Sequence, residues 1–261
     1  MAEHHATIEV SDGAAIPLRK DRGLFSAWRL SFVAALCLFA YLVIFKQGPY
    51  LRLLKLLPGG ILVTFEVTVA SIVVSAVIGL FTGLGRLSHN RLINLVASTY
   101  VEVVRGIPLL VQLFYLYYAM ARFVPVPDIA AAVIAMSVCY GAYMGEIFRA
   151  GIESIDRGQT EAALSLGFNR TQTMFYVILP QAWRTILPPV GNESIALLKD
   201  TSLVSILAVS DLLRRGREFA SESFLYFETF TLIAVIYLLI TLILSKLVST
   251  MEERLRYYER L

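Results

Sequence analysis

Residues 61–83 read ILVTFEVTVASIVVSAVIGLFTG and contain a single charged side chain, Glu66. A helix needs roughly 20 apolar residues to cross the bilayer core, so this stretch is long enough to span it. Only helices and closed barrels satisfy every backbone polar group in lipid. The apolar stretches of this chain are long and continuous, without the alternating segments of about ten residues that build membrane barrels. The stretch therefore predicts a transmembrane α-helix.

The composition of the whole chain agrees with a membrane protein. Of its 261 residues, 57% are hydrophobic and 16% are charged, whereas soluble domains carry about 45–50% and about 25%. Two cysteines exclude a disulfide framework and a Cys-rich zinc site. Three histidines leave little for metal binding, so we expect no metal site, and a net charge of +3 is too small to indicate nucleic-acid binding.

The same length criterion predicts about six spans in an all-α polytopic membrane bundle. They are residues 28–45, 61–83, 95–120, 129–151, 188–210 and 226–248. The first span is short, and charged residues interrupt the fifth.

Basic residues predict the orientation of the bundle, because cytoplasmic loops are enriched in Lys and Arg. With six spans, the side that holds both termini carries 14 basic residues and the opposite side carries 7. Both termini are therefore predicted to be cytoplasmic, with residues 1–24 and 251–261 as polar tails. Residues 25–57 form an additional N-terminal helix and an outer loop in this interpretation.

Two pairs of glycines occur four residues apart inside predicted spans, Gly79 with Gly83 and Gly141 with Gly145. Such pairs let helices approach closely. We expect them to pack helices within the bundle, with a seam between two subunits as the alternative.

The connection at residues 152–187 is long for a compact protein, which favours a functional role. Thr160–Leu166 is rich in Ala and Leu and predicts a short helix, which Gly167 ends. Asn169 and Gln172 have the spacing of a capping box and predict a second helix, which Pro180 limits. Two short helices joined at a glycine suit docking into a groove of another protein. An amphipathic segment lying on lipid headgroups is the alternative.

The residues of this connection resemble the EAA loop of ABC importer permeases. The matching positions are Glu161, Ala162, Ala163, Gly167, Leu179 and Pro180, and the one departure is Val177, where isoleucine is usual. The resemblance extends over roughly residues 58–250. YVEVVRGIPLLVQ at 100–112, GAYMGEIFR at 141–149 and LKDTSL at 198–203 are similar to permeases for polar amino acids of the histidine/glutamine type.

This resemblance implies that the chain is one subunit of a complex in a bacterial inner membrane, in which different chains have different roles. Two permeases, identical or paralogous, pair with each other, and each EAA loop inserts into a groove of a cytoplasmic ATPase dimer. A periplasmic binding protein delivers the amino acid. The chain lacks a Gly-x-x-x-x-Gly-Lys-Ser/Thr phosphate loop, so we expect ATP to be bound by the partner and no cofactor by this chain.

Ionisable residues inside spans are costly in lipid, so they indicate a pathway or a buried contact. Glu66 lies near the start of the second predicted span. A set of polar residues marks the fifth span and its end: Asn192, Glu193, Lys199, Asp200, Thr201 and Ser202. Positions 193 and 200 are about two helical turns apart and share one face. We interpret these residues as candidates for the substrate path, with a buried structural network as the alternative.

Two other pairs of opposite charge are three residues apart, Glu102 with Arg105 and Glu146 with Arg149, and predict ion pairs within single helices. No His-Glu-x-x-His or Gly-x-Ser-x-Gly motif is present, so an intramembrane enzyme is disfavoured and no catalytic residue is predicted. An ion-driven secondary transporter acting alone is the alternative function. It would not need the two-helix docking loop.

Overall fold

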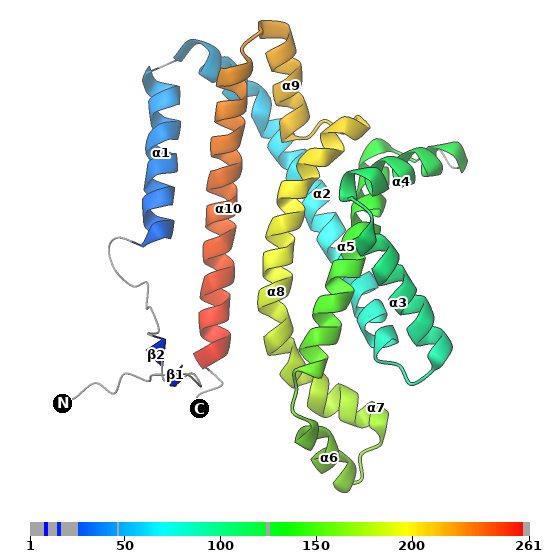
Figure 1. Ribbon diagram of the computed structural model, residues 1–261. Coiled ribbons are helices and arrows are strands. Elements are labelled where there is room, and N and C mark those ends of the chain that lie inside the picture. The colour runs from blue at the N-terminus through cyan, green and yellow to red at the C-terminus, as the bar shows by residue number, and fades with distance from the viewer. Residues whose placement is uncertain (1–7, 10–14, 17–25, 46, 124–125, 258–261) are drawn as a thin grey trace, which may run out of the picture.

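The structure, a computed structural model, describes residues 8–9, 15–16, 26–45, 47–123 and 126–257 (Figure 1). Its helices are α1 (Ala27–Phe45), α2 (Gln47–Arg86), α3 (Arg91–Gly106), α4 (Leu109–Phe123), α5 (Asp128–Glu153), α6 (Arg157–Ser165), α7 (Arg170–Gln172), the π-helix η1 (Thr173–Ile178), α8 (Leu179–Asp200), the 3-10 helix η2 (Thr201–Leu207), α9 (Leu212–Ser223) and α10 (Tyr226–Tyr257). The predicted all-α bundle is thus confirmed.

Within the described residues, four helices are long and apolar enough to cross a membrane, namely α1, α2, α5 and α10. Helices α3 and α4 make a fifth span only if they are counted together. Helix α8 does not belong to this apolar group; its sequence contains prolines, amides and charged residues, in agreement with the interrupted fifth span that the sequence predicts.

The two ends of the bundle carry different elements. Figure 1 shows the start of α1 and the end of α10 at the same end of the bundle, beyond which α6 and α7 protrude, while α9 lies at the opposite end. We call the end from which α6 and α7 protrude the loop end, and the opposite end the α9 end. At the loop end, the indole N–H of Trp28 donates to the carbonyl of Leu242 at 2.8 Å, which fixes α1 on α10.

Helices α2 and α5 cross in close contact along the middle of the bundle, and glycines make that contact possible. A Cβ atom on Gly83 would lie 2.8 Å from the Cβ of Phe148, and one on Gly145 would lie 2.9 Å from Cγ2 of Thr82. Gly79 and Gly141 are equally crowded by the partner helix. The expectation that these glycines pack helices within the bundle is confirmed.

The span predicted at 95–120 is not one continuous helix but is broken in the middle. Helix α3 ends at Gly106 and α4 begins at Leu109, with a bend of 110° between them. Pro108 has no backbone N–H to continue the ladder of α3 and disfavours helical geometry at Ile107, which is extended. The bend sends α4 away from the direction of α3 (Figure 1).

The predicted fifth span at 188–210 also has different bounds. Helix α8 begins earlier, at Leu179, and changes at Thr201 into the 3-10 helix η2, which ends with Ala208 in the left-handed region (φ 70°). The N–H of Leu179 bonds to the carbonyl of Met174, five residues back, so the π-helix runs directly into α8. Pro180 therefore does not limit the second loop helix, because the helical chain continues across it from the π-helix into α8.

Helix α2 is much longer than the predicted span, because it begins at Gln47 and contains Pro58. Its first turns pack with α1, α9 and α10 around Leu53 and Leu57, which are fully buried. In the N-terminal tail, β1 (Ile8–Glu9) and β2 (Ala15–Ile16) form a short antiparallel pair that the sequence patterns do not predict. The basic residues at 19–22 and 260, which contribute to the predicted orientation, lie outside the described residues.

Helix α9 is fixed to α2 at its first turn. Asp211 caps the helix by accepting hydrogen bonds from the backbone N–H groups of Leu213 (3.3 Å) and Arg214 (2.9 Å). The hydroxyl oxygen of Thr64 on α2 accepts from the N–H of Leu212 at 3.1 Å. The Asp211 side chain is fully buried, and this burial raises its pKa to about 6.

Candidate functional site

The first candidate site is a polar cluster inside the bundle, where α8 meets α5. The hydroxyl of Tyr140 on α5 donates a 2.6 Å hydrogen bond to Oδ2 of Asp200, the last residue of α8. Tyr140 is only 3% exposed. A hydrogen bond to a charged acceptor in a water-poor setting is strong, so this contact fixes the end of α8 against α5.

A second tyrosine extends the cluster to α3. The rings of Tyr140 and Tyr143 lie 5.8 Å apart, and Cζ of Arg105 lies 5.6 Å from the centre of the Tyr143 ring. This is the geometry of a cation–π contact. Glu193 on α8 is close enough to Arg105 and Asp200 to interact with both electrostatically. The cluster therefore contains one guanidinium, two carboxylates and two aromatic rings from three helices.

The structure brings together only part of the predicted path. Glu193 and Asp200 face this cluster, and Thr201 is buried and donates to the carbonyl of Leu198 at 2.6 Å. By contrast, Asn192 and Lys199 are exposed on the surface of this chain. Ser202 is half-buried.

Glu66 lies apart from these residues. It is exposed on α2 and makes no hydrogen bond or ion pair with the residues that the structure describes. Its neighbour Thr64, and not Glu66 itself, takes part in a contact between helices. Thr68 donates to the carbonyl of Thr64, and Thr64 in turn binds the start of α9.

The predicted ion pair between Glu102 and Arg105 is wrong, because both side chains are exposed and Arg105 lies over Tyr143. The pair of Glu146 with Arg149 is confirmed. Glu146 also binds Arg86 of α2, and Arg149 also binds Glu153. This network braces the loop ends of α2 and α5 directly before α6.

One residue holds the bend between α3 and α4. The amide of Gln112 donates to the carbonyls of Val104 (2.6 Å) and Ile107 (2.7 Å), which the end of α3 leaves without helical partners. Its oxygen accepts from the thiol of Cys139 on α5 at 3.1 Å. Because Arg105 lies between these two carbonyls in the sequence, Gln112 also supports the position of Arg105.

The second candidate site is the loop that protrudes at the loop end. Helix α6 begins at Arg157, capped by Asp156 and not at the predicted Thr160, so Glu161 lies past its first turn. Gly167 has φ +90°, a conformation that side chains disfavour, and ends the helix as predicted. The capping box of Asn169 with Gln172 is also confirmed.

The loop presents a mixed surface. Glu161 and Ala162 are exposed, whereas Ala163 is buried. Leu179 is half-buried and Pro180 is exposed at the start of α8. Large apolar side chains also face outward on this loop: Leu164, Leu166, Phe168, Phe175 and Tyr176. Water-exposed apolar patches of this kind mark contact surfaces.

The sequence patterns identify Glu193 and Asp200 but miss Tyr140 and the role of Arg105. A phenol in the middle of an otherwise apolar span is the signal that could have found Tyr140, because a buried tyrosine hydroxyl requires a partner. Among the residues that the structure describes, no group of three or more His, Cys, Asp or Glu side chains could hold a metal ion.

Comparison with known proteins identifies the class of this fold. Residues 75–257 match the family described as "Binding-protein-dependent transport system inner membrane component". This match covers more than half of the chain, which therefore belongs to that family. It is a multi-pass membrane protein and a translocation subunit, not an enzyme, and a partner chain hydrolyses ATP.

Individual relatives are similar over most of their length. The chain is 38% identical over 206 residues to the glutamine transport system permease protein GlnP of Escherichia coli (strain K12), which covers 78% of this chain and 94% of that protein. It is 40% identical over 209 residues to the L-cystine transport system permease protein TcyB of Bacillus subtilis (strain 168), covering 78% and 88%.

Chains in solved structures of ABC transporters are also similar to this chain. The chain resembles a chain in the crystal structure of an amino acid ABC transporter with histidines, with a TM-score of 0.74 and 41% identity over 78% of this chain and 96% of the other. The MetNI methionine ABC transporter, solved in inward-facing conformations, shares the fold, with a TM-score of 0.63 and 18% identity over 77% and 98%. These matches support an ATP-driven importer over an ion-driven transporter.

Proposed function

We propose that this chain is the permease through which an ABC importer moves polar amino acids. Relatives named for glutamine, cystine and arginine transport support this substrate class. The cluster of Arg105 with Glu193 and Asp200 is the observation that carries the proposal. Amino acids are zwitterions, and a path through lipid that presents both signs of charge lowers the cost of moving them.

The substrate path runs along α8 in this proposal. Glu193 and Asp200 meet the ammonium group, and Arg105 meets the carboxylate. Thr201 and Ser202 continue the polar surface beyond the end of α8. Glu66 on α2 provides a carboxylate nearer the α9 end, where the amino acid enters. The exposed positions of Asn192 and Lys199 fit a path that is completed by a second chain.

Coupling to the ATPase occurs through residues 152–187. The contact surface is formed by Glu161, Ala162, Gly167, Leu179 and Pro180 together with the exposed apolar side chains of the loop, and the buried Ala163 packs beneath it. The protrusion of α6 and α7 from the bundle supports this role (Figure 1). The ion pairs of Glu146 support it further, because they connect the base of the loop rigidly to α2 and α5.

The complete importer contains two permeases, identical or paralogous, a cytoplasmic ATPase dimer and a periplasmic binding protein, in a bacterial inner membrane. The loop end faces the cytoplasm and the α9 end faces outward, in agreement with the excess of basic residues on the side of the termini. Residues 58–250 form the permease domain in this proposal, and residues 25–57 add helix α1 and the first turns of α2 to it.

Uptake of radiolabelled L-glutamine into vesicles reconstituted with the cognate ATPase and binding protein tests the proposal. We expect ATP-dependent uptake, and we expect Glu66→Gln and Asp200→Asn to alter its kinetics without preventing assembly. Glu228→Gln, which changes a carboxylate at the start of α10 outside the path, is the control. Normal uptake by both path variants would remove these residues from the path. Absence of uptake of any polar amino acid by the wild type would overturn the function.

A further inference from the structure

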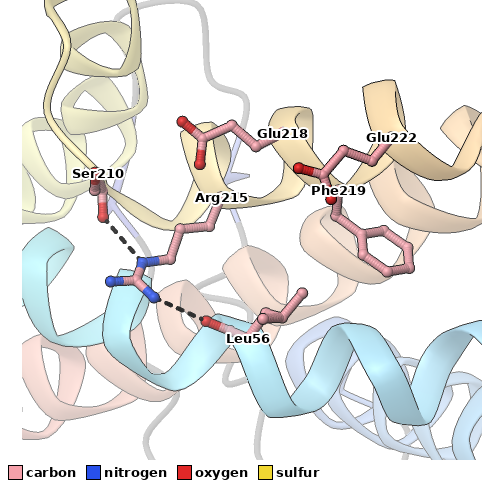
Figure 2. Close-up of a pocket in the computed structure, with 6 residues that line it drawn as sticks. All are labelled: Leu56, Ser210, Arg215, Glu218, Phe219 and Glu222. Carbon is pink, nitrogen blue, oxygen red and sulfur yellow. Dashed lines mark hydrogen bonds between the residues drawn. The ribbon is translucent and has the colours of Figure 1, made fainter.

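Basic side chains at the two ends of the bundle have different partners. At the α9 end, the guanidinium of Arg215 donates to the carbonyls of Ser210 and Leu56, each at 3.4 Å, and so joins α9 to α2 (Figure 2). Towards the loop end, the exposed Lys246 of α10 makes no hydrogen bond or ion pair with the residues that the structure describes. Its Nζ lies 5.9 Å from the centre of the Trp28 ring on α1. The three N–H donors of this ammonium group are therefore open to an anion from outside the chain.

The Trp28 indole is held in a fixed position. Its N–H donates to the carbonyl of Leu242 on α10 at 2.8 Å, and its ring stacks on Phe32 at 5.1 Å with 8° between the planes. Leu242 precedes Lys246 by about one helical turn, so both lie on the same face of α10. Because the indole is fixed, its cation–π contact positions the ammonium group in advance at the seam between α1 and α10.

Helix lengths place this contact at the level of the lipid headgroups. Helix α1 has 19 residues, or about 28 Å of helix, which matches a hydrocarbon core of about 30 Å, and Trp28 is its second residue. On α10, Lys246 follows Tyr226, at the α9 end, by roughly 30 Å of helix. Tryptophan is enriched at this boundary of the membrane. The anions that lie at the level of Lys246 are therefore lipid phosphates.

The neighbouring surface suits a lipid better than a soluble anion. Exposed apolar side chains follow on both helices towards the middle of the membrane, namely Val33 and Leu36 on α1, and Leu238 and Ile243 on α10. Acyl chains can lie against these side chains while the headgroup stays at the level of the ammonium group. A soluble anion would use the ammonium group alone.

The charge around the seam favours an anion. Arg29 follows Trp28, is exposed, and adds a positive charge in the first turn of α1, where the helix dipole is also positive. The sequence of α1 contains no acidic residue. On α10, Glu252 and Glu253 lie about 10 Å farther along the helix than Lys246. A lipid phosphate at the seam is therefore closer to cations than to carboxylates of these two helices.

We propose that an anionic phospholipid binds at the seam between α1 and α10, with its phosphate on the ammonium group of Lys246 and its acyl chains on the exposed apolar side chains. This lipid touches both helices and adds to the hydrogen bond of Trp28 that holds α1 on α10. A zwitterionic lipid carries its own cation, which competes with Lys246 for the phosphate, so the seam prefers the anionic lipid about fivefold. The inference goes beyond the proposed function and does not depend on it.

Quenching of Trp28 fluorescence by brominated lipids tests the proposal. The chain has two tryptophans, so Trp183→Phe leaves Trp28 as the only one. The full-length chain is reconstituted in phosphatidylcholine vesicles that contain increasing fractions of brominated phosphatidylglycerol or of brominated phosphatidylcholine. We expect phosphatidylglycerol to occupy the seam about fivefold more readily than phosphatidylcholine at equal mole fraction.

Variants of the cation test the chemistry of recognition. Lys246→Gln brings the preference down to about one, while an unchanged emission maximum of Trp28 shows that the indole is still in place. Lys246→Arg keeps the preference, because a guanidinium also stacks on an indole and binds phosphate. Arg91→Gln, a matched change of an exposed basic residue at the start of α3, leaves the preference unchanged.

A second reporter measures the general lipid shell. Phe81→Trp, made in a chain without Trp28 and Trp183, places an indole on the exposed surface of α2, away from the seam, and we expect it to show no preference between the two lipids. Equal quenching of Trp28 by both lipids overturns the proposal. A preference that survives Lys246→Gln, or that is as large at Phe81→Trp, overturns it as well.

A water-soluble phosphate separates the lipid from a free anion. Glycerol phosphate in excess, at matched ionic strength, leaves the preference of Trp28 for phosphatidylglycerol unchanged if the acyl chains contribute to binding. Loss of the preference under these conditions assigns the seam to a soluble anion and overturns the proposal. The assay measures no transport, so its failure alongside normal amino-acid uptake leaves the proposed function intact.

Discussion

The hydroxyl of Tyr140 donates to the carboxylate of Asp200 where α8 turns into the 3-10 helix η2. This single contact joins the middle of α5 to the end of α8 and places the Asp200 carboxylate beside Glu193. Two acidic groups that lie this close repel each other, so the hydrogen bond from Tyr140 helps to hold the arrangement in place.

Tyr140→Phe removes this hydrogen bond with almost no change in shape. Loss of a bond to a charged partner costs about 1.5–3 kcal/mol, so we expect the uptake rate to fall about tenfold or more. Uptake in reconstituted vesicles measures this, and size-exclusion chromatography checks assembly. Tyr143→Phe is the control, because its hydroxyl has no hydrogen-bond partner among the described residues.

If Tyr140 acts through Asp200, then Tyr140→Phe combined with Asp200→Asn is no worse than Asp200→Asn alone. Strictly additive losses would mean that the two residues act independently.

Gly167→Ala forces an alanine into φ +90°, although no atom lies within 4 Å of the added Cβ. The change costs about 1–2 kcal/mol through the backbone alone, so we expect weaker co-purification of the ATPase and reduced coupling of ATP hydrolysis to uptake. Gly167→Asn tolerates this conformation better and restores part of the coupling. Gly48→Ala, at an equally open glycine with ordinary φ, serves as the control. Undiminished ATPase binding and uptake in Gly167→Ala would argue against docking.

Gln112→Leu leaves the carbonyls of Val104 and Ile107 without their donor at the bend. An unsatisfied buried polar group costs about 1–3 kcal/mol, so we expect a clear fall in the melting temperature of the purified protein. Gln159→Leu, which changes an exposed glutamine, shifts it little. An unchanged melting temperature in Gln112→Leu would show that the bend is held by Pro108 alone.

Burial of Asp211 predicts a pH dependence of stability. Its folded pKa is about 6, above the value of about 3.9 in an unfolded chain, so the folded state binds more protons between these values. Its stabilising contribution is full below about pH 3.9 and is lost as the pH rises through 6. Asp211→Asn keeps a capping oxygen without the buried charge, and we expect it to raise the melting temperature at pH 7.5 more than at pH 5. An equal shift at both values would contradict this assignment.

Much of the fold follows from local sequence rules. Hydropathy predicts that the apolar stretches are helices, Gly167 predicts the end of α6, and Asn169 with Gln172 predicts the following cap. These features depend on residues within one helical turn of each other. The same rules fail where contacts between residues far apart in the sequence determine where a helix begins or ends. Helix α2 extends back to Gln47 because its first turns find partners on α9 and α10.

The candidate site is likewise predicted only in part from the sequence. Glu193 and Asp200 are visible in the sequence because charge is rare in a membrane span. Spacing also pairs Arg105 with Glu102, yet the bend after Gly106 and the packing of α3 on α5 place Arg105 over Tyr143. A helical wheel represents one helix at a time, so it cannot show which side chain of a neighbouring helix competes for a charge.

The contact of Trp28 with the carbonyl of Leu242 joins residues 214 positions apart. During synthesis at about 5–20 residues per second, the first helix therefore waits roughly 10–40 s before the segment that receives it has been made. Throughout that time α1 is an apolar helix in the bilayer without its final neighbour. Docking of α1 onto α10 is accordingly a late step in the biogenesis of this protein, and it closes the bundle only after the last helix has entered the membrane.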